Sequence, residues 1–122
     1  KHSEDRFLLY TTQALHDDEV LTALPLMQMC HPHLTLDSWQ EKAKELKANG
    51  GGVVAVKYEN GCIYGILVFE MRCLPCGDKI ISATDIISLK LTGQENCRSR
   101  LLDWIDEFAQ KTACKRVEIN LS

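Results

Sequence analysis

The stretch from Ile80 to Leu121 holds the residues best suited to binding a ligand. It reads as a strand (IISATDIISLKL), a short polar loop (TGQENC), a long amphipathic helix (RSRLLDWIDEFAQKTA) and a second strand (RVEINL). The first N–H groups of a helix have no partner within the helix, and here they point past the end of the preceding strand. A junction of this kind can hold a phosphate group. We therefore expect a ligand site at this junction.

Cys73 and Cys76 form a second candidate site, because C-x-x-C followed by glycine is a common half of a zinc site. A tetrahedral site needs two more ligands, and the candidates are Cys30, His31 and His33. The sequence has no second C-x-x-C pair, so an ordinary hairpin turn is favoured over zinc binding or a redox dithiol. No metal site is predicted.

The composition fits one soluble globular domain, residues 1–122, with 45% hydrophobic and 25% charged residues. The formal charge of −3 and the pI of about 5.8 give no general attraction for nucleic acid or an anionic membrane. The longest uncharged apolar-rich run, Gly61 to Phe69, is too short to cross a bilayer. The first residues lack the layout of a signal peptide, so we expect a cytoplasmic protein with mostly reduced thiols.

Hydrophobic periodicity and turn residues predict elements in the order β, α, α, β, β, β, α, β. The expected ranges are Arg6 to Thr12, Asp17 to Met29, Ser38 to Asn49, Val53 to Tyr58, Cys62 to Met71, Ile80 to Leu91, Asn96 to Thr112 and Val117 to Leu121. Pro25 predicts that the first helix starts late, kinks or splits. Thr35 or Asp37 is expected to cap the second helix, and Asn60-Gly61 predicts a two-residue hairpin turn.

This order places a meander of antiparallel strands before one crossover helix and a last strand parallel to the fourth. The prediction is an α+β fold with a mixed central sheet and helices on both faces. Trp39 and Trp104 have apolar neighbours at helical spacing and are predicted to pack in the core. His33 is interpreted as a structural loop residue.

Several of these segments together resemble the GNAT superfamily of acyl-CoA N-acyltransferases. His31-Pro32-His33-Leu34-Thr35 resembles the R-P-H-L-T that precedes the second helix of some bacterial members. Thr84 to Leu89 is similar to the D-D-L-V-x-L of the family's fourth strand. Ser99 to Ile105 resembles the S-x-L-L-x-W-L of its third helix, and Ala113 to Leu121 resembles the A-x-x-x-G-C ending and fifth strand. The resemblance covers most of the chain from about Cys30 onward and implies a GNAT-like fold.

The sequence departs from the family pattern in two places. Family members carry Q/R-x-x-G-x-G/A before the third helix, and those glycines let the backbone wrap the CoA pyrophosphate. Here Cys97 replaces the first glycine, Ser99 replaces the terminal glycine or alanine, and Glu95 adds a negative charge. The family also continues with a fourth helix and two more strands beyond the position of Ser122. The resemblance therefore implies a fold truncated after the fifth strand, with an open edge at which a homodimer could form.

The resemblance implies roles for several residues of the junction. Asp85 would be the catalytic base or would bind the acceptor amine, and the alternative is a purely structural strand carboxylate. The acetyl-CoA site would comprise Ser88, Leu89 and Lys90 along the pantetheine arm, and Gln94, Asn96, Cys97, Arg98 and Ser99 around the pyrophosphate. Arg98 and Arg100 supply positive charge, although an exposed basic first turn would look the same.

Two functions follow from the resemblance. The first is transfer of an acetyl group from acetyl-CoA to a small-molecule or peptide amine, as a transferase. The second is a catalytically degenerate GNAT-like domain that binds a ligand or a protein through the same cleft or through its open sheet edge. The altered loop leaves both open, since a fold alone does not fix a function.

Overall fold

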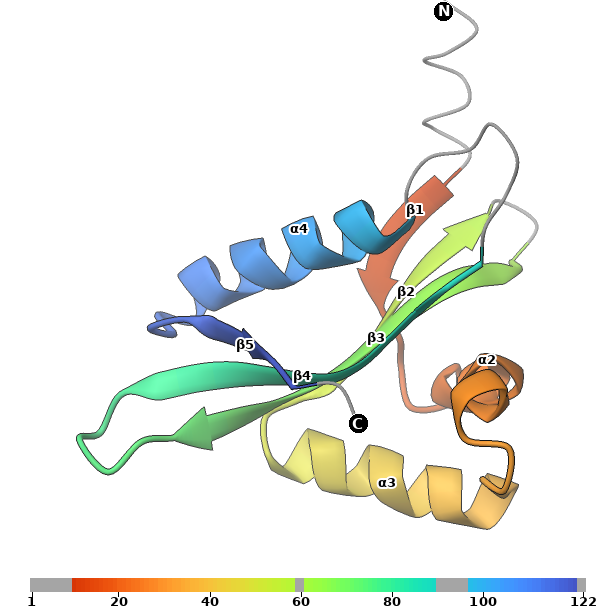
Figure 1. Ribbon diagram of the computed structural model, residues 1–122, viewed down its shortest axis with the longest axis horizontal. Helices are drawn as coiled ribbons and strands as arrows, with labels where there is room; N and C mark the ends of the chain where they lie inside the picture. The colour runs from red at the N-terminus through yellow and green to blue at the C-terminus, as the bar shows by residue number, and fades with distance from the viewer. Residues whose placement is uncertain (1–9, 59–60, 90–96, 121–122) are drawn as a thin grey trace, which may run out of the picture.

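The computed structural model describes residues 10–58, 61–89 and 97–120 (Figure 1). Their strands form one mixed sheet in the order β1-β2-β3-β4-β5. The strands are β1 (Tyr10–Ala14), β2 (Gly52–Tyr58), β3 (Ile63–Cys73), β4 (Lys79–Ser88) and β5 (Val117–Ile119). Neighbours from β1 to β4 are antiparallel, and β5 runs parallel to β4. The predicted fold class is confirmed.

The helices cover both faces of this sheet. They are the 3₁₀-helix η1 (Val20–Ala23) and the α-helices α2 (Leu24–Cys30), α3 (Leu36–Ala48) and α4 (Cys97–Lys111). Figure 1 shows α2 and α3 on one face and α4 on the other. No helix in the described ranges is long and apolar enough to cross a membrane.

The first predicted helix, Asp17 to Met29, is wrong as one element. Asp17 and Asp18 lie in a turn, η1 begins only at Val20, and α2 follows with Pro25 in its first turn. Proline has no N–H to donate, so it fits the start of a helix and not its interior. The split that Pro25 predicted is therefore confirmed.

The α3 helix begins at a capping box. The Thr35 hydroxyl accepts a hydrogen bond from the Ser38 N–H (3.2 Å), and the Ser38 hydroxyl accepts one from the Thr35 N–H (3.0 Å). Thr35, one of the two predicted caps, is thus the cap that the structure uses. On the buried face of α3, Trp39 is fully buried, and its indole N–H donates to the Val20 carbonyl at 2.8 Å. Trp39 therefore joins α3 to η1.

The buried side chains of the central strands alternate between two cores. The core under η1, α2 and α3 includes Val53, Ala55, Ile66, Val68 and Ile87. The core under α4 includes Val54, Val56, Leu67, Ile81 and Ala83. The α4 helix adds Leu101 and Ile105 to the second core, whereas Trp104 is only partly buried. Core packing, predicted for both tryptophans, is confirmed in full for Trp39 alone.

A β-bulge interrupts the pairing of β3 with β4. Val68 pairs with Asp85 and Phe69 pairs with Ala83, so Thr84 has no partner on β3. Such a bulge bends a strand and increases its twist. On its other side, β4 pairs with β5 only from Ile81 to Ala83. The bulge therefore marks the point beyond which β4 has no neighbour on its outer edge among the residues that the structure describes.

Element boundaries otherwise lie within a few residues of the predictions. Parts of four predicted segments fall outside the described residues: 6–9 of the first strand, Asn60 of the hairpin turn, 90–91 of the fourth strand and Asn96 at the start of the last helix. The same holds for Leu121 of the last strand. Within the hairpin turn, Gly61 has a φ of 90°, which suits glycine.

Candidate functional site

The centre of the candidate site is a hydrogen bond between His31 and Asp85. His31 Nε2 lies 2.7 Å from Asp85 Oδ1. The Asp85 side chain is 8% exposed and that of His31 is 35% exposed. The Thr84 hydroxyl donates to the second carboxylate oxygen, Asp85 Oδ2, at 3.2 Å. Both oxygens of this buried carboxylate are therefore engaged, whereas His31 Nδ1 has no partner among the described residues.

The sequence around His31 holds the imidazole in place. The His31 N–H donates to the Met27 carbonyl, which completes α2, and the Leu34 N–H donates to the His31 carbonyl at 3.0 Å. Pro32 disfavours helical angles at His31, whose φ of −129° and ψ of 75° end the helix. On the opposite side, the bulge at Thr84 sets the direction of Asp85. Two local irregularities thus bring the pair together.

Backbone groups of β4 line an open edge next to this pair. Parallel pairing with β5 ends where the Asn120 N–H donates to the Ala83 carbonyl at 2.8 Å. The Leu89 N–H donates to the Tyr64 carbonyl of β3 at 2.8 Å. Along a strand, the backbone N–H and C=O groups of successive residues point alternately to its two edges. Because those of Leu89 point to β3, those of Ser88 and Ile86 point to the opposite edge of β4. These groups face the side of β4 that β5 leaves uncovered.

The first turn of α4 lies across the start of β3 and the end of β4. Gly65, which pairs with Ser88, allows this approach, because a Cβ there would lie 3.2 Å from Cys97 Cβ and 3.4 Å from Leu101 Cδ1. The first turn contains no acidic residue, and its side chains include Arg98 and Arg100. The helix dipole and these two charges make the start of α4 electropositive. An electropositive helix start therefore lies beside the open edge of β4.

The predicted site residues occupy different environments. Asp85 is buried in the His31 pair, and Ser88 is exposed at the end of β4. Leu89 is partly buried against the core under α2 and α3, and its N–H already donates to the Tyr64 carbonyl. Cys97 is 4% exposed and packs in the core under α4, whereas Arg98 and Ser99 are exposed. Lys90, Gln94 and Asn96 lie outside the described residues.

His31 is the residue whose role the sequence did not indicate. It was weighed only as a zinc ligand and as part of a motif, yet it contacts a carboxylate 54 positions away. The nearest signal was Pro32, which ends α2 and leaves the imidazole off the helix. His33, two residues later, is exposed.

The Cys73 to Asp78 segment is an ordinary hairpin turn. The Leu74 N–H donates to the Asp78 carbonyl at 2.8 Å, and Gly77 has a φ of 94°. Both thiols are free and exposed, and the Cys76 thiol lies 3.5 Å from Asp78 Oδ2. A hydrogen bond from Lys115, followed by that from Cys76, lowers the pKa of the Asp78 carboxyl. Nowhere in the described ranges do three or more His, Cys, Asp or Glu side chains gather as metal ligands would.

Comparison with known proteins identifies the fold. No family model and no curated protein matches the sequence. Among solved structures, a Trypanosoma brucei acetyltransferase aligns with a TM-score of 0.75 at 14% identity, over 93% of this chain and 83% of that one. The aminoglycoside N-acetyltransferase AAC(6')-Iy in complex with CoA aligns with a TM-score of 0.76 at 12% identity, over 93% and 77% of the two chains. A GNAT family acetyltransferase of Staphylococcus aureus aligns with a TM-score of 0.68 at 14% identity, over 91% and 85%.

These matches define the class of fold: the chain has the GNAT acetyltransferase fold, as the sequence motifs predicted. At such low identity the likeness concerns the fold, and the activity has to be argued from the site itself.

Proposed function

We propose that this protein is a GNAT-superfamily N-acetyltransferase that transfers an acetyl group from acetyl-CoA to a primary amine on a small molecule or a peptide. The observation that carries the proposal is the open outer edge of β4 beside the start of α4. A CoA molecule has amide groups along its pantetheine arm and phosphates at its other end. The open edge of β4 can bind the pantetheine amides, and the electropositive start of α4 can bind the phosphates.

The residues present fit acetyl-CoA despite the missing glycines. Backbone groups of Ile86 and Ser88 would bind the pantetheine amides, in the way that a strand binds an extended peptide. The backbone N–H groups of the first turn of α4, together with the charges of Arg98 and Arg100, would bind phosphate. Cys97, which takes the place of a glycine, packs into the core and so does not narrow the helix start. Bound acetyl-CoA supplies the acetyl group as an activated thioester.

His31 and Asp85 are the proposed proton-handling pair. Asp85 accepts a hydrogen bond from His31 Nε2–H, which leaves the lone pair on Nδ1 of this 35% exposed side chain available. The amine nitrogen attacks the thioester carbonyl carbon while its proton passes to His31 Nδ1. The new C–N bond forms, the C–S bond breaks, and the thiolate leaves and is protonated from solvent. Asp85 orients the imidazole and stabilises its charged form.

Calorimetric titration with acetyl-CoA tests the first half of the proposal. We expect saturable heat, and no detectable heat at about millimolar ligand would overturn it. Release of the CoA thiol, followed with a thiol reagent over a panel of polyamines, aminoglycosides and peptides, then tests transfer. Binding of acetyl-CoA without transfer to any amine would favour the degenerate binding module instead.

Variants test the roles of the pair. His31→Gln is expected to reduce turnover by about 10²- to 10⁴-fold with acetyl-CoA affinity nearly unchanged, because general base catalysis acts on the chemical step. Asp85→Asn should also reduce turnover. The matched control is His33→Gln, in the same loop but exposed, which should keep full activity. Full turnover in His31→Gln would exclude His31 as the base.

A further inference from the structure

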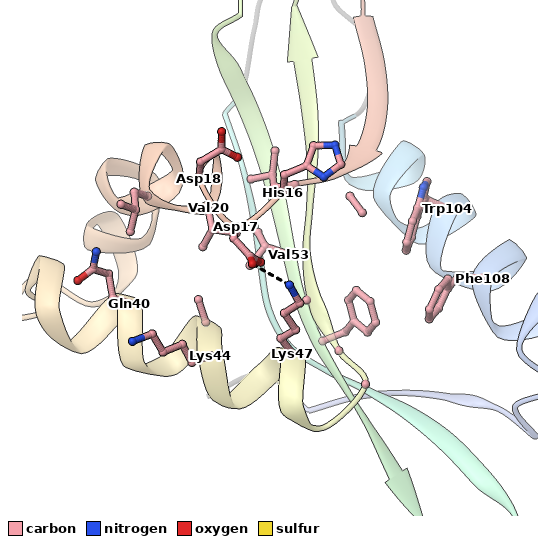
Figure 2. A pocket seen from close by; sticks show the side chains of 18 residues that line it. His16, Asp17, Asp18, Val20, Gln40, Lys44, Lys47, Val53, Trp104 and Phe108 are labelled. Atoms are coloured by element: carbon pink, nitrogen blue, oxygen red, sulfur yellow. Dashed lines mark hydrogen bonds and ion pairs between the residues drawn. The ribbon is translucent and has the colours of Figure 1, made fainter.

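A cavity of about 790 Å³ lies at the other edge of the sheet, where β1 ends (Figure 2). The last contact of this segment with β2 is the hydrogen bond from the Leu15 N–H to the Val53 carbonyl, at 2.8 Å. The chain then turns away toward η1, so the start of β2 pairs with β3 on one side and has no strand on the β1 side among the described residues. The cavity surrounds this bare start of β2, with α3 on one side and α4 on the other. It includes none of the residues of the candidate acetyl-transfer site.

Three consecutive glycines, Gly50 to Gly52, form the floor of the cavity. At two of these positions the structure requires a glycine. Gly50 has a φ of 75° at the end of α3, a conformation that favours glycine. At Gly51 a Cβ would overlap the Phe69 carbonyl oxygen and would lie 2.5 Å from Glu70 Cα. Gly52 differs from both, since a Cβ there would meet only Phe69 Cε1, at 4.0 Å.

Gly52 therefore has no steric or conformational need to be glycine. Gly52 is the first residue of β2, and as a glycine it contributes no side chain to the packing there. Its effect at position 52 is to keep the space above the floor open. A side chain at position 52 would occupy part of this space, which the glycine leaves available to a ligand.

Phe69, Trp104 and Phe108 form the aromatic wall of the cavity. The rings of Trp104 and Phe108 are nearly parallel, at 13°, with centroids 5.1 Å apart. Phe69 meets Phe108 edge to face at 5.3 Å. The Trp104 indole N–H donates to no acceptor within the described part of the chain. The aromatic wall is thus apolar and includes one donor, the Trp104 indole N–H.

Gln40, Lys44 and Lys47 form the polar wall, since their spacing along α3 places them on one side of the helix. Lys47 Nζ lies 2.7 Å from Asp17 Oδ2, which neutralises that carboxylate. For Lys44 and Gln40 the structure records no side-chain partner among the residues it describes. Asp18, the other acid on the lining, turns its carboxylate away from the two lysines in Figure 2. The polar wall therefore favours a negatively charged group.

We propose that this cavity binds a small aromatic carboxylate, with its ring against the aromatic wall and its carboxylate directed toward the lysines of the polar wall. Binding sites for small molecules have volumes of about 300–1,000 Å³, apolar walls and a few polar groups, as this cavity has. A charge-assisted hydrogen bond from Lys44 fixes the orientation of the ligand. The proposal is independent of acetyl transfer, because it uses other residues.

Titration of the ¹⁵N-labelled protein with 2-naphthoate, followed by NMR, tests the site. We expect saturable shifts of the Gly52 N–H and the Trp104 indole N–H, and no shift of the buried Trp39 indole N–H. Neutral 2-naphthalenemethanol should bind about tenfold more weakly, and cationic 2-naphthylmethylamine more weakly still. Absence of saturable shifts at Gly52 and Trp104 would overturn the site. Equal or tighter binding of the amine would overturn the assignment of an anionic ligand.

Variants separate the cavity from the fold. Gly52→Val should keep or raise the melting temperature, because a β-branched residue suits a strand, yet weaken 2-naphthoate binding by more than about tenfold. Lys44→Ala should weaken 2-naphthoate by about three- to tenfold and leave 2-naphthalenemethanol unchanged. Lys42→Ala, an exposed lysine of α3 outside the cavity, is the matched control and should change neither. Unchanged 2-naphthoate affinity in a folded Gly52→Val protein would overturn the proposal.

Discussion

His31 Nε2 and Asp85 Oδ1, 2.7 Å apart, join the end of α2 to the bulge of β4. The carboxylate is buried, and its other partner is the Thr84 hydroxyl. A buried carboxylate that loses a hydrogen-bond donor keeps its desolvation cost without the compensating bond. The pair is therefore expected to affect stability as well as the proposed catalysis.

The first prediction concerns this coupling. In a double-mutant cycle of His31→Ala and Asp85→Ala, followed by urea unfolding, we expect a coupling free energy of about 1–3 kcal/mol. His31→Ala alone should destabilise the protein, because the carboxylate is left with Thr84 only. A coupling energy indistinguishable from zero would mean that the two side chains do not support one another.

The second prediction concerns Trp39. Replacement by phenylalanine removes the indole N–H that donates to the Val20 carbonyl and leaves that carbonyl without its partner. It also leaves space in a fully buried position. We expect Trp39→Phe to lower the free energy of unfolding by about 2–4 kcal/mol. Trp104→Phe is the control, and its loss should be smaller because Trp104 is only partly buried. Equal losses would contradict the burial of Trp39.

The third prediction compares two adjacent glycines. Gly51→Ala places a Cβ on the backbone of Phe69 and Glu70, where no flexible side chain can move aside. We expect a loss of about 3 kcal/mol or more in the free energy of unfolding. Gly52→Ala, one position later, should be neutral or slightly stabilising, since its Cβ has room. Thermal unfolding of both variants measures this difference in stability. A Gly51→Ala protein as stable as the wild type would contradict the close approach of β3.

The fourth prediction concerns pH. A hydrogen bond from Lys57, at 2.7 Å, and one from the His16 N–H lower the pKa of Glu19 below its usual value of 4.5. Because the folded pKa is depressed, Glu19 stabilises the protein above about pH 4.5, and this stabilisation is lost as the pH falls through the folded value. The stability difference between the wild type and Glu19→Gln should therefore shrink from about pH 6 to about pH 3 in chemical unfolding. A difference that stays constant over this range would show that the Lys57 contact does not form in solution.

Local patterns in the sequence were enough to predict most of the fold. Apolar runs bounded by turn residues predicted the strands, Thr35 predicted a helix start, and Pro25 predicted the break between η1 and α2. These features depend on hydrogen bonds and side chains within a few residues of one another. The one helix expected from Asp17 failed, because the Glu19 and Val20 N–H groups donate to the His16 carbonyl and close a turn, and η1 begins only at Val20.

The chemistry of the site was decided by the tertiary structure. The sequence identified Asp85, but only folding brought His31 to it, across 54 positions, since no local pattern encodes a contact of that range. The same holds for the cavity, whose aromatic wall comes from β3 and α4 and whose polar wall comes from α3. The short pairing of β5, which leaves the edge of β4 open, also depends on how the bulge at Thr84 bends the sheet. Sequence fixes which groups are available, and long-range packing decides which of them meet.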